Sequence, residues 1–231
     1  MRRPAAPPAR PVRIEGTRFL NEAESLALVA EAGLPVIEHR LCKNEAEVDA
    51  AAAAFPGAVV VKACSPDVPH KSDHGLVTLN PADPAREFRR QLDEMKRMGA
   101  RSEGVIVARL AAPGRELALG ARMDPQFGPV VLIGDGGVYL EALKDFRLLL
   151  APFTEEDAAR KLAELRVAPL LAGVRGQAAR DVAAFAAMAV RLGEAMLRWD
   201  GAVASVDLNP VIVFETGAGA VAVDALVECR L

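Results

Sequence analysis

The short run AVVVKA, residues 58–63, is the feature that most limits the possible folds of this chain. Its three consecutive valines favour a strand, and the run is too short for a typical helix. Because apolar residues fill consecutive rather than alternate positions, we expect this strand to be buried on both faces. The chain is therefore expected to place it inside a layered arrangement of strands and helices.

Helix and strand patterns are mixed along the rest of the chain. Helices are predicted where a capping residue precedes an apolar stripe, and strands where short apolar runs are bounded by turn residues. The predicted helices are 21–33, 44–55, 84–98, 154–165 and 180–199. The predicted strands are 35–42, 58–63, 76–80, 105–112, 115–123, 129–134, 202–214 and 220–228.

A turn signal, Pro113-Gly114, divides these elements into two groups. We expect an α+β (α/β) protein with an N-terminal lobe over residues 16–112 and a C-terminal lobe over 113–231. Residues 1–15 are rich in Pro and Arg and are expected to form a flexible tail. A cleft between two such lobes is a usual place for a ligand.

Composition and charge argue against several classes of protein. Aromatic residues make up only 4% of the chain, and the formal net charge is −3. Few stacking side chains and no excess of positive charge disfavour nucleic acid or an anionic membrane as partner. No apolar run reaches membrane-spanning length, and the start of the chain lacks the apolar core of a signal peptide. We expect a cytoplasmic protein whose three cysteines, Cys42, Cys64 and Cys229, are reduced thiols.

The loop SPDVPHKSDHG, residues 65–75, follows the buried strand and holds two of the three histidines of the chain. Lys62, near the end of that strand, is either a lysine whose stem follows the apolar surface or a contact to an anion such as phosphate. His70 is either an exposed loop residue or a group that meets a negatively charged partner. A zinc site with His74 is not favoured, because no cysteine pair follows.

A second group of polar residues lies near the C-terminus. Asp207 and Asn209 belong to the sequence VDLNP, and Asp224 stands on the next predicted strand. Antiparallel pairing of the two strands would bring Asn209 close to Asp224. Oxygen ligands without sulfur or imidazole suit Mg²⁺. The alternative is an ordinary Asx turn at the end of a strand.

Two glutamates and a glycine loop are weaker candidates. Glu116 and Glu141 each follow a turn or loop, where they could hold a ribose or a metal, or remain solvated charges. Gly136 and Gly137 could cover phosphates with backbone N–H groups. Their loop matches neither the Walker pattern nor the GxGxxG pattern.

Four segments, taken in order, resemble a known family. They read VVVKACSPDVPHKSDHG, GRELALGARMDPQFGPVVLIGDGGVYLEALKD, VAPLLAGVRG and VDLNPVIV. The set resembles the ATP-grasp subunit of ADP-forming acyl-CoA synthetases, whose best-known members are acetate–CoA ligases. It is more distantly similar to the β subunit of succinyl-CoA synthetase. The resemblance covers residues 17–228.

The resemblance implies an ATP-grasp fold, in which two lobes close on ATP or ADP with Mg²⁺. His70 would accept a phosphoryl group, in line with the ability of imidazole to offer a neutral nitrogen near pH 7. The resemblance also implies phosphate contacts for Lys62, Gly136, Gly137 and Glu141. The strand end Ala108–Ala112 would contact adenine, and Glu116 would contact ribose. Mg²⁺ would be bound by Asn209 and Asp224, with Asp207 close by.

The resemblance also implies a partner. CoA binding in this family belongs to a Rossmann-like region, and no Rossmann fingerprint occurs in these 231 residues. We expect a CoA-binding α subunit or domain in a hetero-oligomer. Three alternatives remain open: a regulatory ATP-binding module of a fused synthetase or acyltransferase, a free-standing ATP-grasp ligase that joins a carboxylate to an amine, and an excised domain of a longer fused synthetase.

Two departures from the family pattern touch the phosphate-binding loops. Family members often read HKSDVGGV where this chain reads HKSDHGLV, so that Leu76 replaces a glycine. Asp135 stands where a small or apolar residue is more usual, and a carboxylate there could repel phosphate.

Overall fold

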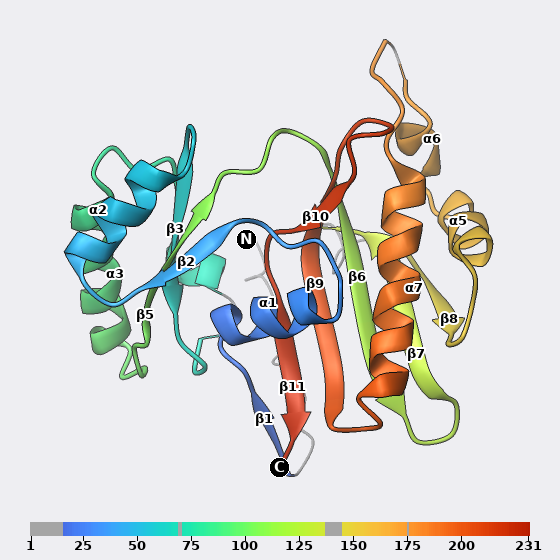
Figure 1. Ribbon diagram of the computed structural model, residues 1–231, viewed down its shortest axis with the longest axis horizontal. Coiled ribbons are helices and arrows are strands. Elements are labelled where there is room, and N and C mark those ends of the chain that lie inside the picture. Colours follow the sequence, from blue (N-terminus) through green and yellow to red (C-terminus); the bar gives the residue numbers. More distant parts are fainter. Residues whose placement is uncertain (1–15, 69–70, 137–144, 175) are drawn as a thin grey trace, which may run out of the picture.

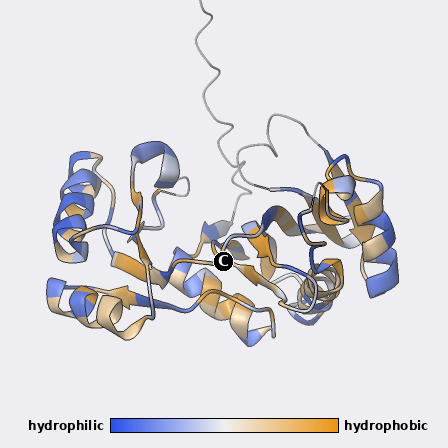
Figure 2. Cartoon of the chain, turned by 90° about the horizontal axis from the view of Figure 1, so that it is seen from above, coloured by the Kyte–Doolittle hydropathy of each residue, from blue (hydrophilic) through white to orange (hydrophobic). Residues whose placement is uncertain are grey.

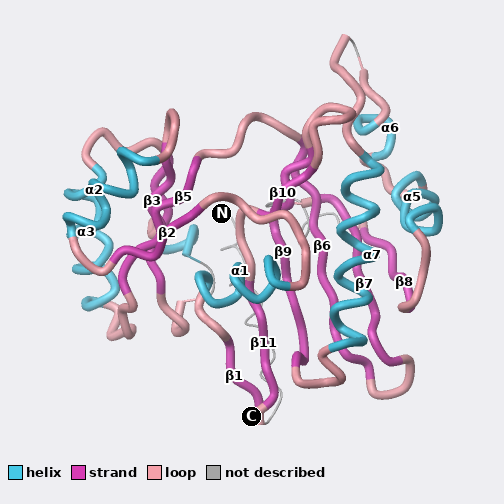
Figure 3. Tube along the Cα trace, viewed as in Figure 1, coloured by secondary structure: helices cyan, strands magenta, loops and turns pink. Residues whose placement is uncertain are grey.

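The computed structural model describes residues 16–68, 71–136, 145–174 and 176–231. Within these ranges the chain forms two antiparallel sheets, each covered by helices on one face (Figure 1). Figure 3 shows the strands of the small sheet and of the large sheet as two separate groups, with loops crossing between them. The layered arrangement expected from the run 58–63 is therefore present as an α+β fold.

The small sheet has four strands in the order β2-β5-β3-β4. Their bounds are His39–Cys42 for β2, Gly104–Arg109 for β5, Val59–Cys64 for β3 and Val77–Leu79 for β4. Helices α2 (Glu45–Ala54) and α3 (Pro84–Arg97) pack on one face of this sheet. All six residues of β3 are buried, which confirms the reading of this run as a strand covered on both faces.

The large sheet follows the order β1-β11-β9-β6-β7-β8, and β10 pairs with β9. The bounds are Thr17–Phe19 for β1, Leu226–Arg230 for β11, Val203–Val213 for β9, Arg115–Asp124 for β6, Gly128–Asp135 for β7, Phe146–Leu150 for β8 and Ala220–Ala222 for β10. Its helices are α1 (Glu22–Glu31), α5 (Glu155–Ala163), α6 (Ala168–Leu171) and α7 (Val182–Arg198). They share one apolar core with the sheet.

The helix starts follow the capping signals in the sequence. Asn21 accepts a hydrogen bond from the backbone of Glu24 at the start of α1, and the Glu24 side chain completes the capping box. Asn44 and Thr154 cap α2 and α5 through the same kind of bond. In Figure 2 the strands of both sheets are mostly hydrophobic, and hydrophilic segments are prominent on the helices around them. Among the described residues, no helix is both long and apolar enough to cross a membrane.

Several predicted strands differ from the observed ones. The predicted strand 35–42 is regular only over 39–42, because residues 35–38 cross between the sheets and hydrogen-bond to Ala222. The predicted strand 220–228 is interrupted at 223–225, where β10 ends before β11 begins. The predicted strand 105–112 ends at Arg109, and residues 110–114 form the link to the large sheet.

The predicted N-terminal lobe, residues 16–112, corresponds only in part to the small sheet. Strand β1 pairs with β11, and α1 packs on the core of the large sheet through Leu26 and Val29. The described part of the chain therefore starts on the large sheet, crosses to the small sheet and returns through residues 110–114. The sequence pattern gave no sign of this first passage, because β1 has only three residues.

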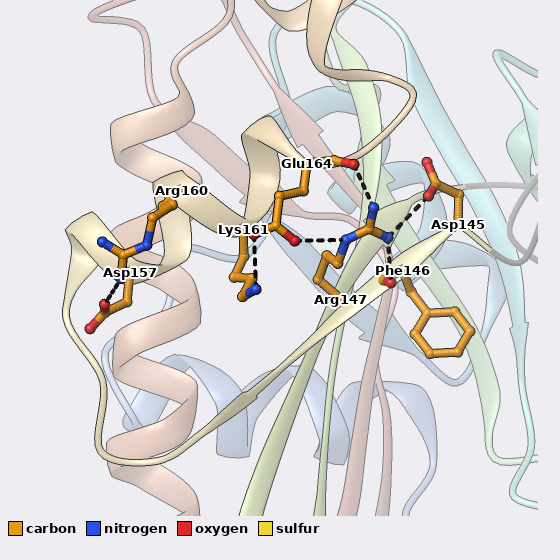
Figure 4. Close-up of polar contacts among 7 residues, drawn as sticks. All are labelled: Asp145, Phe146, Arg147, Asp157, Arg160, Lys161 and Glu164. Atoms are coloured by element: carbon orange, nitrogen blue, oxygen red, sulfur yellow. Dashed lines mark hydrogen bonds and ion pairs between the residues drawn. The ribbon is translucent and has the colours of Figure 1, made fainter.

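Strand β8 was not predicted and forms an edge of the large sheet. Its Arg147 faces the end of α5, where Nε lies 3.1 Å from Glu164 Oε2 and Nη1 lies 3.2 Å from Asp145 Oδ1. Figure 4 shows these contacts and shows the ring of Phe146 pointing away from them. The strand is therefore fixed by polar contacts on one face, while Phe146, Leu148 and Leu150 are exposed at alternate positions.

Candidate functional site

Four charged side chains meet where α1, the small sheet and the β10–β11 turn come together. We call Glu22, Lys62, Lys71 and Asp224 the buried ion cluster. Lys62 Nζ lies 2.8 Å from Glu22 Oε1, and Lys71 Nζ lies 2.9 Å from Glu22 Oε2. Lys71 Nζ is also 3.9 Å from Asp224 Oδ1. Two positive and two negative charges therefore share one largely enclosed site.

Each member of the cluster comes from a different part of the chain. Glu22 is the first residue of α1, and Lys62 lies on the face of β3 that looks toward the large sheet. Lys71 opens a short 3-10 helix, Lys71–His74, directly after His70. Asp224 lies in the turn between β10 and β11. The fold thus gathers residues that are far apart in the sequence.

Burial and charge act in opposite directions on these groups. Burial disfavours the charge of Lys62 and Lys71, but Glu22 and then Asp224 outweigh burial, so the pKa of each lysine is raised. Burial would raise the pKa of Glu22, but the two lysines lower it on balance. The pKa of Asp224 is raised, first by burial and then by the Glu22 carboxylate. Glu22 is therefore the main counter-ion of both lysines.

Asn209 and Asp224 occupy facing positions, as the hairpin pattern predicts. Ala222 pairs with Val211 on one side of this point, and Leu226 pairs with Asp207 on the other. The same register places residue 224 opposite residue 209. Asp207 precedes Asn209 by two residues in β9, and the pairing of β9 with β6 is irregular between Leu208 and Val211.

The donor set at this point fits a hard divalent cation. Within the described ranges, no three His, Cys, Asp or Glu side chains gather in the manner of a protein-only metal centre. The oxygens of Asp224 and Asn209 are instead of the kind that hold Mg²⁺ together with oxygens of a bound phosphate. A nearby cation would also offset the negative charge of the half-buried Asp224 beside Glu22.

Strands β6 and β7 place Glu116 and Gly136 side by side. Glu116 is exposed, and its carbonyl oxygen accepts a hydrogen bond from Gly136 N at 3.2 Å. A Cβ at residue 136 would come within 2.6 Å of the backbone of Leu117, so only glycine fits there. Asp135 forms an ion pair with Arg115, which offsets the negative charge in this loop.

A cavity of about 510 Å³ lies beside the link between the two sheets. It begins just past Ala108, which is itself buried in the small sheet. Its walls are mainly apolar, and both sheets contribute. The lining residues are Val36, Ile37, Glu38, Arg109, Ala111, Ala112, Pro113, Phe214, Glu215, Ala218 and Val221. Its volume lies in the usual range for small-molecule sites, about 300–1,000 Å³.

Three predicted site residues, His70, Gly137 and Glu141, lie outside the described residues. The chain connection still limits the place of His70, because the next residue, Lys71, is a member of the buried ion cluster. The departure at Leu76 has a clear structural role. Its side chain is fully buried against Ala63, Val68 and Met95.

The remaining histidines and the cysteines do not form a second centre within the described ranges. His39 lies in β2, and its Nδ1 is 2.9 Å from the carbonyl oxygen of Ile37. Cys42 and Cys64 are buried free thiols, in line with the reading from the sequence. Burial raises the pKa of Cys64 to about 11, so this thiol stays protonated at neutral pH.

Sequence reasoning missed Glu22. An acidic residue in the first turn of a helix is common, because it faces the positive end of the helix dipole. This ordinary signal hides the contacts to Lys62 and Lys71, which depend on the packing of α1 against the small sheet.

Comparison with known proteins places this geometry in context. A family model described as an ATP-grasp domain matches residues 12–229. The β subunit of ADP-forming acetate–CoA ligase II from Pyrococcus furiosus is 35% identical over 220 residues, which cover 93% of each chain. The ADP-forming acetate–CoA ligase I of Archaeoglobus fulgidus is 39% identical over 199 residues, which are 84% of this chain but only 29% of that longer protein.

Solved structures agree with these relatives. One is the dinucleotide-forming acetyl-coenzyme A synthetase 1 of Ca. Korarchaeum cryptofilum in complex with coenzyme A, Ca-AMPCP and HgCl⁺. It superposes on this chain with a TM-score of 0.86 at 35% identity, covering 92% of this chain and 94% of that one. Another structure of that enzyme, with coenzyme A and Mg-AMPPCP, has its phosphohistidine segment pointing towards the nucleotide binding site. This structure superposes with a TM-score of 0.75 at 35% identity, covering 92% of this chain and 93% of that one.

Proposed function

Because this chain belongs to the ATP-grasp domain family, we propose that it is the nucleotide-binding subunit or domain of an ADP-forming acyl-CoA synthetase. The complete enzyme would interconvert a carboxylate, CoA and ATP with acyl-CoA, ADP and phosphate. The nearly full-length match to named β subunits and the resemblance to a nucleotide-bound synthetase support this proposal.

The nucleotide would lie between the two sheets. Its adenine would occupy the apolar cavity beside Ala111 and Ala112, its ribose would reach Glu116, and its phosphates would meet Lys62 and the backbone at Gly136. The pairing of Asp135 with Arg115 supports this placement, because the carboxylate does not leave an uncompensated negative charge beside the phosphates.

The observation that carries the proposal is the place of Lys71. Its side chain is buried between the carboxylates of Glu22 and Asp224, close to Lys62, and it is the residue after His70. His70 is therefore tied by one peptide unit to the cluster proposed to meet the phosphates. The γ-phosphoryl group would move from ATP to a ring nitrogen of His70 as its bond to the ADP oxygen breaks.

Asn209 and Asp224 would hold Mg²⁺, with Asp207 nearby. When bound, this ion would neutralise part of the charge on the nucleotide phosphates. The facing positions of residues 209 and 224 support this assignment. The two lysines of the buried ion cluster would supply the remaining positive charge.

The CoA-binding part would come from a partner. The relative from Pyrococcus furiosus is named as a β subunit, and the relative from Archaeoglobus fulgidus is about three times as long as the region that matches. We propose that this chain works with an α subunit, or a fused domain, that binds CoA and the acyl group. His70 would exchange its phosphoryl group with that partner.

A labelling experiment tests the proposed function. The purified chain is incubated with γ-³²P-ATP and Mg²⁺, beside the variant His70→Asn. We expect acid-labile label on the native protein and none on the variant, with equal ATP binding by calorimetry. ATP binding without label, even when a CoA-binding partner is present, would remove the relay and favour a regulatory nucleotide-binding module.

A further inference from the structure

We propose that Glu22 is a positioning residue for phosphoryl transfer, acting as the shared counter-ion that keeps Lys71 away from the cation ligand Asp224. This inference rests on the proposed function and adds a residue that the predicted site did not contain. Glu22 does not itself touch the nucleotide in this scheme. It acts through the two lysines that it binds.

The geometry of Glu22 is suited to this role. Its side chain is 1% exposed, and each carboxylate oxygen takes one lysine, Lys62 at 2.8 Å and Lys71 at 2.9 Å. Lys62 donates a hydrogen bond to Oε1, a charge-assisted contact that fixes direction as well as distance, whereas Lys71 forms an ion pair with Oε2. The carboxylate therefore sets the spacing between a lysine of β3 and the lysine that follows His70.

The position of Glu22 is itself fixed by the fold. The residue before it, Asn21, caps α1 in a capping box with Glu24. One and two turns farther along the helix, Leu26 and Val29 are fully buried in the core of the large sheet. The carboxylate is thus attached to a rigid helix start, which is the kind of support that a precise site needs.

The two lysines would respond differently to loss of Glu22. Lys62 Nζ also donates a hydrogen bond to the carbonyl oxygen of Val223 at 2.6 Å, so it retains a partner. For Lys71 the other nearby carboxylate is Asp224, at 3.9 Å. A buried ammonium group without its counter-ion is costly, so Lys71 would move onto Asp224. That carboxylate would then be less available to Mg²⁺.

The test is the variant Glu22→Gln, which keeps the side-chain shape and removes the charge. Binding of Mg²⁺ in the presence of the non-hydrolysable analogue AMPPCP is measured by calorimetry, and His70 labelling is measured over a range of Mg²⁺ concentrations. We expect the Mg²⁺ affinity to fall roughly 10-fold, the lower end of the effect known for residues that support metal ligands. The Mg²⁺ concentration for half-maximal labelling should rise by the same factor.

A double variant separates positioning from general damage. In Glu22→Gln/Lys71→Met the competing ammonium group is gone, so Mg²⁺ affinity at saturating AMPPCP should exceed that of Glu22→Gln, even though Lys71 is itself proposed to meet the phosphates. The matched control is Glu24→Gln, on the same helix, which removes one carboxylate charge while Gln can still complete the capping box, and which touches neither lysine. It should change the melting temperature little and leave Mg²⁺ affinity unchanged.

The outcomes separate the two proposals. If the native chain neither binds ATP nor becomes labelled, the proposed function fails first. If the native chain does both, unchanged Mg²⁺ affinity in Glu22→Gln overturns the positioning role. The same conclusion follows if the double variant does not recover. If Glu22→Gln does not fold, Glu22→Asp is tested in its place. Because its side chain is shorter by one methylene, the carboxylate cannot reach both lysines. Unaltered Mg²⁺ affinity in Glu22→Asp would also overturn the positioning role of Glu22.

Discussion

Two clusters in this protein hold the same charges in different surroundings. The buried ion cluster has two lysines and two carboxylates, with side-chain exposures of 1–8% for Glu22, Lys62 and Lys71 and 32% for Asp224. The second group, which we call the surface ion cluster, consists of Asp145, Arg147, Lys161 and Glu164 (Figure 4). Its members are up to 43% exposed.

The difference lies in what can replace a lost partner. In the surface ion cluster water reaches most of the charged groups, so each ion pair adds little to stability. In the buried ion cluster water cannot take the place of a missing charge, and an unpaired member is costly. The surface cluster joins one strand to the helix that follows it, whereas the buried cluster joins α1, β3 and the β10–β11 turn. Enclosed charges that link distant segments are the better candidates for a binding role.

The largest expected effect comes from Lys62→Met. If the buried ion cluster receives the nucleotide phosphates, this change removes one fixed positive charge from the site. We expect ATP to bind about 100-fold more weakly, which corresponds to about 2.7 kcal/mol. Calorimetric titration with ATP and Mg²⁺ measures the change.

The control for this variant is Arg147→Met in the surface ion cluster, which also loses one positive charge. It should bind ATP like the native chain. Near-ultraviolet circular dichroism of both variants verifies that they are folded. Equal ATP affinity for Lys62→Met and the native chain would mean that the buried ion cluster is only structural.

Asp181 is an intermediate case between the two clusters, because its carboxylate is held by backbone N–H groups and not by lysines. Asp181 caps α7 by accepting from Ala184 N at 3.1 Å, and it also accepts from Gly217 N and Gly219 N, each at 2.9 Å. Asp181→Asn keeps one acceptor oxygen and loses the other. We expect about 2 kcal/mol less stability at pH 7, measured by urea unfolding.

The pH dependence of this effect has a definite sign. The N–H groups of Gly219, Ala184 and Gly217 lower the pKa of Asp181 below its usual value of about 3.9. The stabilisation is complete above that usual value and is lost as the pH falls through the lower folded-state pKa. The gap between native and Asp181→Asn proteins should therefore shrink below about pH 4. A gap that is constant from pH 7 to pH 2.5 would contradict this account.

Local patterns in the sequence predicted much of the fold. The capping residues Asn21, Asn44 and Thr154 and the valine run of β3 all act through near neighbours in the chain, so their structures follow from short segments. Strands β1 and β8 were not predicted: β1 has only three residues and pairs with the distant strand β11, and β8 is a five-residue strand at the edge of the sheet. The passage of residues 35–38 between the sheets is likewise a tertiary effect.

The residues of the candidate site also fall into those that local sequence patterns predicted and those that only the tertiary structure shows. The facing of Asn209 and Asp224 was predictable, because a hairpin relates residues that are near in sequence. Lys62 was recognisable as a charge in an apolar strand. Glu22 was not, because an acidic first residue of a helix has a common local explanation. Only the packing of α1 shows that its carboxylate serves two lysines.

The smallest expected effect is on the surface ion cluster itself. Arg147→Met removes contacts to Glu164, to Asp145 and to the carbonyl oxygen of Phe146, the last at 2.9 Å. Asp145 keeps a hydrogen bond from Arg166 N, so we expect a loss of only about 1 kcal/mol in urea unfolding. Arg160→Met, in an exposed pair on α5, should cause no measurable change. A loss for Arg147→Met as large as that for Asp181→Asn would mean that the edge strand β8 depends on its charges as strongly as helix α7 depends on its cap. Exposure would then no longer explain the difference between the two clusters.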